Sequence, residues 1–328
     1  MNEGPRRPPG SGATREVAVT FDDLPVICVT NGDLATHRDI TTRLLAALAS
    51  RRVPAVGFVN EEQFTDDGRR DEGRVDLLRR WLDAGQELGN HTFGHLDMHR
   101  TPLARFKEDV IRGEVAIREL MRERGMALRY FRHPYLHTGT DLVSKRHLEE
   151  FLLERGCRVA PATVYVEDYL FAAAYDRAMR RGDRRTAKRV ADAYVPYVES
   201  NFAYYEDLSR RLLGYEVRQT VCFHANSINA ERFGEMAEML ERRGYAFVTL
   251  ERALEDEPYA APDPYVGSEG ISWLQRWALN RGLGEEFLEG QPLTPWFVRL
   301  QAETGRGARL MRLWNRWSYA FRALTPRS

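Results

Sequence analysis

The sequence predicts an α/β protein built as a barrel of about seven strand–helix units. Short runs rich in β-branched and aromatic residues alternate with segments of helical periodicity, and this alternation continues over roughly 240 residues. Strands that alternate with helices form parallel sheets covered by those helices. A closed or nearly closed (β/α) barrel therefore fits the pattern, and an open, doubly wound sheet is the alternative.

The predicted elements are short and regularly spaced. Period-two apolar runs predict strands at 16–21, 55–60, 87–91, 128–134, 157–166, 216–224 and 245–250. Apolar residues at helical spacing predict helices at 40–52, 73–85, 101–125, 145–156 and 230–244.

Three stretches fall outside the alternation. Residues 1–14 are rich in Pro and Gly and are predicted to be disordered. Residues 169–214 are predicted to be helical throughout, as an insertion in a barrel domain that spans 15–256. Residues 257–328 follow a Pro-rich joint and are predicted to form a helical extension that packs on the barrel. The arginines and tryptophans of its last part, 305–328, also suit a basic amphipathic helix on an anionic surface.

Charge and cysteine content exclude several classes of protein. Lys and Arg together number 48, as do Asp and Glu, so the chain lacks the basic excess of a nucleic-acid binder. The three cysteines form no C-x-x-C pair and predict neither a disulfide framework nor a cysteine zinc site. Neither a secretory leader nor a membrane span is seen, which as written predicts a cytoplasmic protein. A chain that had lost its leader, and so acts outside the cytoplasm, would read the same way. The oligomeric state is left open.

Ionisable residues gather where the predicted strands end. They are Asp22 and Asp23 after the first strand, His91 and His95 after the third, Arg132 at the fourth, Asp168 past the fifth and His224 at the end of the sixth. In a parallel barrel all these positions face one rim, which is where barrel enzymes place their chemistry.

His91 and His95 have the spacing of a metal site. One helical turn would put both imidazoles on the same side, and a neighbouring aspartate would add a third ligand. Three protein ligands leave coordination positions open, as a catalytic metal requires. Read alone, such histidines are surface residues and such aspartates are helix caps, and His99, one turn further, is expected to lie on the surface.

The remaining residues suit acid–base chemistry. Beside a cation, one aspartate can ligate while the other accepts a proton from water. Arg132 is expected to hold the second aspartate by a bidentate pair. His224 with Asp168 suggests a protonated imidazole oriented by a carboxylate, a general acid for an amine leaving group. Taken singly, these three residues read as a salt bridge, a core histidine and a helix cap.

Five short motifs together resemble those of the polysaccharide deacetylases, the NodB homology domain of carbohydrate esterase family four. They are TFDD (20–23), GQELGNHTFGH (85–95), FRHPY (131–135), EDYLF (167–171) and VCFHAN (221–226). They occur in the family's order over about 16–256, and the fourth is a loose match because Tyr169 stands where tryptophan is usual. Each motif is weak alone, and the ordered set is specific.

The resemblance implies a deformed TIM barrel and a metal-dependent hydrolase acting on non-peptide C–N bonds. Asp23, His91 and His95 would bind a divalent metal, Zn²⁺ or else Co²⁺ or another divalent ion. Asp22 would be the general base, steadied by Arg132.

His224 would then be the general acid, tuned by Asp168, and the backbone amide of Tyr135 would help to hold the oxyanion. The implied reaction is attack of metal-bound water on an N-acetyl group, or an O-acetyl group, of an amino-sugar polysaccharide or oligosaccharide. The alternatives are a hydrolase of a non-sugar amide or cyclic imide, and a glycan-binding relative without catalytic activity.

Some features depart from the family pattern. Leu24-Pro25 stands where glycine is frequent after TFDD, and Leu24 is expected to narrow the sugar site. The helical stretch 169–214 is longer than usual and is expected to form a wall or lid. Of the adjacent Tyr204 and Tyr205, one is expected to face the cleft.

Overall fold

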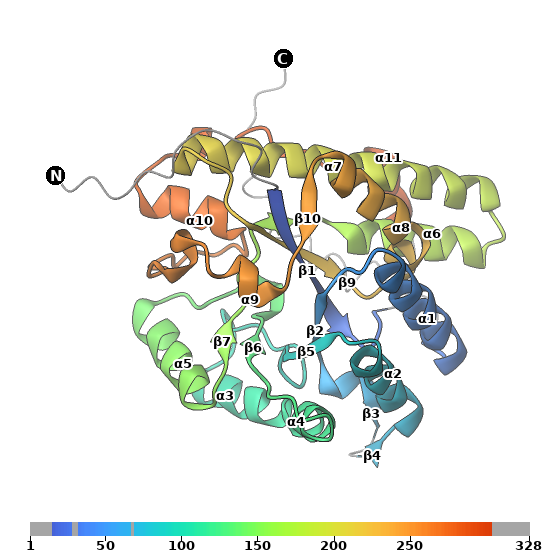
Figure 1. The fold of residues 1–328 in the computed structure, drawn as a ribbon, viewed down its shortest axis with the longest axis horizontal. Helices are drawn as coiled ribbons and strands as arrows, with labels where there is room; N and C mark the ends of the chain where they lie inside the picture. Colours follow the sequence, from blue (N-terminus) through green and yellow to red (C-terminus); the bar gives the residue numbers. More distant parts are fainter. Residues whose placement is uncertain (1–14, 28–31, 67–68, 304–328) are drawn as a thin grey trace.

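A wholly parallel sheet occupies the centre of the molecule and helices surround it (Figure 1). The computed structural model describes residues 15–27, 32–66 and 69–303. The eight strands of the sheet are β1 (Arg15–Leu24), β2 (Ala55–Val59), β5 (Glu87–Asn90), β6 (Tyr130–Phe131), β7 (Arg158–Val159), β8 (Val164–Tyr165), β9 (Gln219–His224) and β10 (Tyr245–Phe247). A separate antiparallel pair is formed by β3 (Thr65–Asp66) and β4 (Arg69–Arg70). The predicted α/β class is confirmed.

The two edges of the sheet are joined by four residues. The strand order is β7-β6-β5-β2-β1-β9-β8, and β10 pairs with the first residues of β1. The edge strands β7 and β8 are consecutive in the chain and separated only by residues 160–163. Ala160 N–H donates to Phe131 O at 2.7 Å on one edge, and Thr163 N–H donates to Thr220 O at 2.9 Å on the other. The sheet is therefore curled into a nearly closed barrel, and the open-sheet alternative is wrong.

This crossing corrects one prediction. The single strand predicted at 157–166 is split into β7 and β8, which pair with opposite edges. Pro161 lies at the split, and because proline has no N–H to donate, it cannot continue a ladder.

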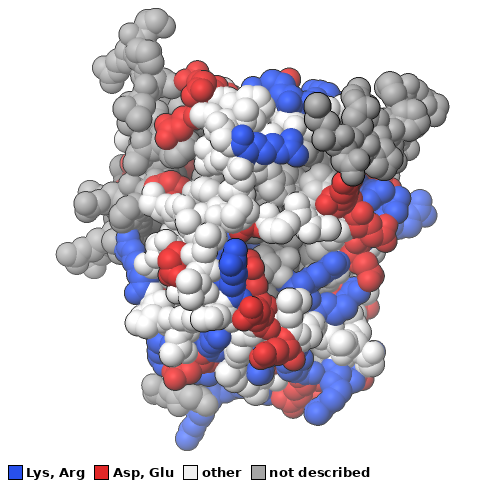
Figure 2. All heavy atoms as spheres, turned by 90° about the vertical axis from the view of Figure 1, so that its left-hand side faces the viewer, with Lys and Arg blue, Asp and Glu red and all other residues white. Residues whose placement is uncertain are grey.

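The helices cover the outside of the barrel. They are α1 (Leu34–Ser50), α2 (Glu72–Asp83), α3 (Leu103–Arg112), α4 (Val115–Arg122), α5 (Leu142–Glu154), α6 (Asp168–Arg180), α7 (Arg184–Leu213), α8 (Ser227–Arg242), α9 (Leu250–Ala253), α10 (Trp273–Asn280) and α11 (Trp296–Glu303). Short 3-10 turns lie at Glu61–Phe64, Pro134–Leu136, Glu257–Ala260 and Glu285–Leu288. On the face that Figure 2 displays, acidic and basic side chains are interspersed and not separated by sign.

The prediction of a single helix at 101–125 is wrong, because the helix is interrupted between α3 and α4. At the break, a Cβ added to Gly113 would lie 2.3 Å from the carbonyl carbon of Thr92. The buried Glu61 carboxylate then accepts the N–H groups of Ala116 and Ile117, at 2.7 and 3.1 Å, and caps the start of α4. The break lets the chain after β5 pass directly against the helices.

The stretch predicted to be helical, 169–214, consists of α6 and α7, which pack on each other and on α8. Neither Tyr204 nor Tyr205 faces a cleft, so that expectation is wrong. Tyr204 Oη donates to Leu288 O at 2.6 Å, and Tyr205 Oη accepts from Gln291 Nε2 at 3.0 Å. Both tyrosines are buried because they join α7 to the C-terminal extension.

The extension is fixed to the barrel by a fully buried arginine. Arg276, on α10, donates through Nη1 to Thr138 Oγ1 at 2.9 Å and through Nη2 to Leu136 O, and it pairs with Asp263 at 3.2 Å. Within the described residues, no helix is both long and apolar enough to span a bilayer. The predictions for 1–14 and 305–328 lie outside the described residues.

Replacement of Gly113 by alanine should destabilise the protein by about 1–3 kcal/mol, because the added methyl group overlaps the backbone after β5. Gly234→Ala is the matched control, since Gly234 lies inside α8 with nothing within 4 Å of an added Cβ, and this variant should gain about 0.5–1 kcal/mol. Urea unfolding measures both changes. Equal stabilities of the two variants would contradict the close approach at Gly113.

Candidate active site

A cavity of about 250 Å³ lies at the carboxyl ends of the strands. Five of the residues predicted from the sequence contribute to this region as lining: Asp22, His91, His95, Tyr135 and His224. Asp23, Arg132 and Asp168 lie directly behind them and are buried. The residues that were predicted to lie at one rim of the barrel are therefore close together in the folded chain.

An irregularity at the end of β1 lets two consecutive aspartates face this place. Side chains alternate between faces in a regular strand, but the β1–β2 register shifts between Phe21 and Leu24, and Asp23 has φ 63°. Asp23 Oδ1 lies 3.7 Å from His91 Nε2, and Asp22 Oδ2 lies 3.9 Å from the same atom. The strand end thus presents both carboxylates to the same imidazole.

Leu24 does not narrow the cavity, so that expectation is wrong. Its side chain is fully buried and packs over β2, where a Cβ on Gly57 would lie 2.3 Å from Leu24 Cδ2. Glycine at position 57 makes room for the leucine in the core.

The two histidines lie on a loop and not on a helical turn, which corrects the geometry assumed from their spacing. Thr92 and His95 have φ 67° and 52°, a left-handed backbone that folds the loop back on itself. Asn60 Nδ2 donates to His91 O at 2.6 Å, and Asn90 Oδ1 accepts from Thr92 N–H at 2.7 Å. Side chains at the ends of β2 and β5 therefore fix the loop that carries the imidazoles.

Asp109 supports the same loop from α3. Its carboxylate accepts from Gly94 N–H at 3.0 Å, and its backbone carbonyl accepts from Phe93 N–H at 3.0 Å. The buried Asp109, Asn60 and Asn90 were not predicted as site residues; their signal in the sequence is a polar residue at the end or on the inner face of an apolar element.

Asp23, His91 and His95 form a set of metal-ligand donors. One donor atom from each lies within 4.8 Å of the others, and His95 Nε2 is 3.5 Å from Asp23 Oδ1. His91 Nδ1–H donates to Arg132 O at 2.8 Å, which leaves the Nε2 lone pair directed at Asp23. Burial, followed by the charge of His95, lowers the pKa of His91 to about 3. Two neutral imidazoles and a carboxylate fit a divalent transition metal with open positions.

Arg132 and Cys222 flank Asp22. The Arg132 side chain is fully buried over the ring of Phe58, 4.8 Å from its centroid, and donates to Thr20 Oγ1 at 2.8 Å. Its Nε is 4.0 Å from Asp22 Oδ1, too long for a hydrogen bond, so the predicted bidentate pair is wrong. The Cys222 thiol instead donates to Asp22 Oδ2 at 3.2 Å.

His224 is held by the buried carboxylate of Asp168. Asp168 Oδ1 lies 2.6 Å from His224 Nδ1, and Asp168 Oδ2 accepts the backbone N–H of His224 at 2.7 Å. Asn226 and Asn229 donate to the same Oδ2 at 3.1 and 2.6 Å. Burial by itself lowers the pKa of His224, but Asp168, with Asp23 and Asp22 beyond it, raises that pKa to about 9. The imidazole is therefore protonated at neutral pH.

Tyr135 forms part of the opposite wall. It has φ 59° and ψ 8°, and its ring lies edge-on to His95 with centroids 4.5 Å apart. The C-terminal extension presses on it, since a Cβ on Gly270 would lie 1.7 Å from Tyr135 O. Tyr165 and Tyr169, which the sequence did not single out as site residues, add aromatic surface to the cavity.

Strained backbone concentrates around the cavity. Among the described residues, positive φ at non-glycine positions occurs at Asp23, Arg52, Thr92, His95, Tyr135 and Leu136. All but Arg52 belong to the cavity or its supporting loops. Each such residue costs about 1–3 kcal/mol, so the surrounding contacts must impose these conformations. Concentration of strain here is typical of a functional site.

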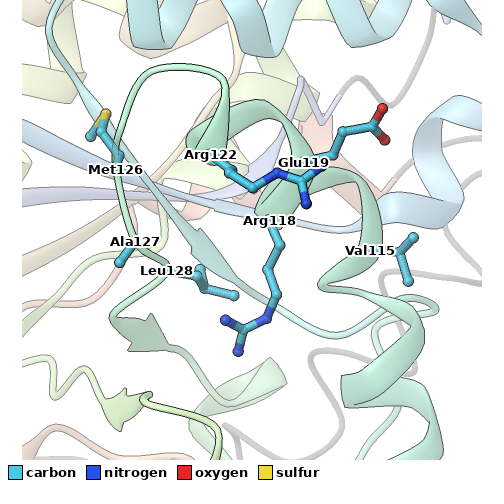
Figure 3. A pocket seen from close by; sticks show the side chains of 7 residues that line it. All are labelled: Val115, Arg118, Glu119, Arg122, Met126, Ala127 and Leu128. Carbon is cyan, nitrogen blue, oxygen red and sulfur yellow. The ribbon is translucent and has the colours of Figure 1, made fainter.

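A separate hollow lies beside α4, and its lining residues differ from those of the cavity. Figure 3 shows its lining side chains, which come from α4 and from residues 126–128 after it. Two of its charged residues are already engaged, because Glu119 pairs with Arg70 at 2.7 Å and Arg118 with Glu114 at 3.0 Å. None of the predicted site residues lines it.

Sequence comparison identifies the same relationship as the motifs. Residues 10–148 match the polysaccharide deacetylase family. The resemblance is confirmed for this part of the chain, which contains the motifs at 20–23, 85–95 and 131–135.

Two curated relatives are chitooligosaccharide deacetylases. The chain is 32% identical over 123 residues to the protein of Bradyrhizobium sp. (strain ANU 289), covering 37% of this chain and 47% of the relative. It is also 32% identical over 135 residues to that of Sinorhizobium fredii (strain NBRC 101917 / NGR234), covering 41% of this chain and 53% of the relative. The matches thus span about half the length of these curated relatives.

Solved structures with a similar course of chain include a deacetylase and a pseudoenzyme. The peptidoglycan deacetylase PdaC from Bacillus subtilis is 20% identical, with a TM-score of 0.46 over 74% of this chain and 91% of that chain. A CE4 family pseudoenzyme from Bacillus anthracis is 16% identical, with a TM-score of 0.47 over 74% and 66%. Likeness at this level carries no conclusion about activity.

Asp168→Ala should lower the free energy of unfolding by about 3–5 kcal/mol, because it leaves a buried charged imidazole and several donors without their acceptor. Asp141→Ala is the matched control: Asp141 is an exposed helix cap that accepts from Ser144 N–H at 2.8 Å, and its loss should cost much less. Urea unfolding at neutral pH compares them. Similar losses in both variants would mean that the His224–Asp168 pair is not charged in the folded protein.

Proposed function

We propose that this protein is a metal-dependent hydrolase that removes N-acetyl groups from an amino-sugar polysaccharide or oligosaccharide. The proposal rests chiefly on the pairing of Asp22 with His224 across β1 and β9 at one cavity. A carboxylate able to accept a proton and an imidazolium able to donate one thus flank the donor set of Asp23, His91 and His95.

Asp23, His91 and His95 would hold the metal. Their donor set of two imidazoles and one carboxylate suits Zn²⁺, and Co²⁺ and related ions accept the same ligands. A divalent ion bound there supplies Lewis-acid chemistry, which polarises a carbonyl group and increases the acidity of water.

The protein's own groups would move the protons. Asp22 accepts the proton of the water that attacks the acetamide carbonyl carbon. The Cys222 thiol donates a hydrogen bond to this carboxylate, and the positive charge of Arg132 lies 4.0 Å from it. As the carbon–nitrogen bond breaks, His224 gives its proton to the departing amine nitrogen and Asp168 keeps the imidazole oriented. Acetate and a free amino sugar are the products. The backbone amide of Tyr135 is assigned to the developing oxyanion.

The cavity wall and the relatives both support this substrate class. The rings of Tyr135, Tyr165 and Tyr169 line the cavity, and such rings suit contacts with the apolar faces of sugars. The two relatives named as chitooligosaccharide deacetylases support an acetylated amino sugar as substrate.

Acetate release from a panel of chitooligosaccharides, peptidoglycan fragments, acetylated xylan and free N-acetylglucosamine tests this function. We expect release from an N-acetylated glycan, its loss after treatment with a chelator, and its return with Zn²⁺ or Co²⁺. Release from xylan alone would indicate an O-acetyl esterase. Failure on every glycan, together with hydrolysis of a simple amide or cyclic imide, would overturn the choice of substrate. Binding of a glycan without any release would indicate a non-catalytic relative.

Single substitutions should separate the metal ligands from the proton carriers. Asp22→Asn and His224→Ala should keep the metal and lose turnover by about 10²–10⁴-fold, because neither replacement can carry the proton. His91→Ala should hold one metal equivalent fewer than the wild type. His147→Ala, at an exposed position on α5, is the control histidine and should change neither property. Elemental analysis and initial rates measure the two effects; wild-type rates in both Asp22→Asn and His224→Ala would refute the mechanism.

A further inference from the structure

A second group of donor atoms lies on the wall of the same cavity. One ligand atom from each of Asp97, His99 and His137 lies within 4.8 Å of the others. None of the three belongs to the donor set of Asp23, His91 and His95, and the mechanism above does not use them. His99 was expected to be a surface residue, but its ring is stacked on that of His137 with centroids 3.8 Å apart and planes 4° apart.

Each imidazole has one nitrogen engaged by an acceptor. His137 Nδ1 lies 2.7 Å from Asp97 Oδ1, and the His99 ring hydrogen-bonds to the backbone of Ser268. A histidine that donates one ring N–H to a carboxylate or a carbonyl has its other nitrogen fixed in the form that binds metals. In each ring the other nitrogen is therefore the one available to a metal.

The charge of the cluster suits a cation. Asp97 brings a carboxylate, and Glu269 is a second carboxylate in the lining of the same cavity. Two positive charges lie nearby: Arg100, whose Nε is 3.5 Å from Asp97 Oδ2, and the buried Arg276, whose charge also acts on His99.

We propose that Asp97, His99 and His137 form a second binding site for a divalent transition metal, separate from the one assigned to Asp23, His91 and His95. Two imidazoles and a carboxylate select zinc, nickel, copper or cobalt over magnesium or calcium. Because parallel rings direct their lone pairs side by side, ligation involves rotation of one ring out of the stack. An ion held there would lie beside the cavity, which Asp97 and His137 line.

Metal binding at this site would join two segments through its ligands and reach a third through the contact of His99 with Ser268. Asp97 and His99 follow the histidine loop, His137 follows the turn at Tyr135, and Ser268 belongs to the C-terminal extension. A Cβ on Gly270 would lie 3.1 Å from His137 Cδ2, so the extension already contacts the ring. A ligand that binds only the folded protein raises its melting temperature, and here the rise should depend on His137.

Titration of the metal-free full-length protein with Zn²⁺ by calorimetry tests the proposal. We expect two equivalents for the wild type and for His147→Ala, one for His91→Ala, one for His137→Ala, and none for the double variant His91→Ala/His137→Ala. A wild type that takes up a single equivalent would overturn the proposal. A double variant His91→Ala/His137→Ala that still binds one equivalent of Zn²⁺ would also overturn it.

Thermal melting guards against a folding artefact. Without metal, His91→Ala and the double variant should melt at similar temperatures; Zn²⁺ should then raise the melting temperature of His91→Ala only. If the double variant unfolds, His91→Ala/His99→Ala takes its place and should likewise show no rise. A rise of equal size in folded variants with and without these ligands would place the ion elsewhere and refute the site.

Discussion

The hydrogen bonds that residues 160–163 make to both edges of the sheet are the constraint on which the rest of the structure depends. Ala160 bonds to the strand that precedes Arg132, and Thr163 bonds to the strand that ends in His224. Were the sheet open, these two residues would lie at distant positions along it. Closure brings Arg132 and His224 to the same side of the molecule, where they join Asp22, which faces His224 directly because β1 and β9 are neighbouring strands.

Buried polar side chains then set the fine geometry. The backbone of the histidine loop is hydrogen-bonded by the side chains of Asn60, Asn90 and Asp109. The carboxylate of Asp168 accepts hydrogen bonds from four donors. Buried groups of this kind are costly unless every partner is present. The loops at the cavity also adopt left-handed conformations that their own residues disfavour. The surrounding network supplies the stability that these local arrangements lack.

The sequence was sufficient for the class of fold, the order of the elements and the convergence of the ionisable residues, because strand alternation in a parallel barrel places all strand ends on one side. It was insufficient where one residue decides the local path. Pro161 split a predicted strand, and Gly113 divided a predicted helix, although both residues were visible. The spacing of His91 and His95 indicated the right pairing through the wrong local structure, since a loop with positive φ brings them together. Tertiary packing sets the distance between Arg132 and Asp22 and the stacking of His99 on His137. Sequence periodicity does not predict such packing.

The C-terminal extension is not separate from the barrel, because it contacts the wall of the cavity. A boundary near residue 256 looks natural in the sequence, but Arg276 reaches back from beyond it to hold Leu136 and Thr138, and Gly270 fits against Tyr135. Residues on both sides of this boundary thus form the wall of the cavity. Lengthening, shortening or replacing this extension would therefore change the shape of the cavity while leaving Asp22, Asp23, His91, His95 and His224 in place.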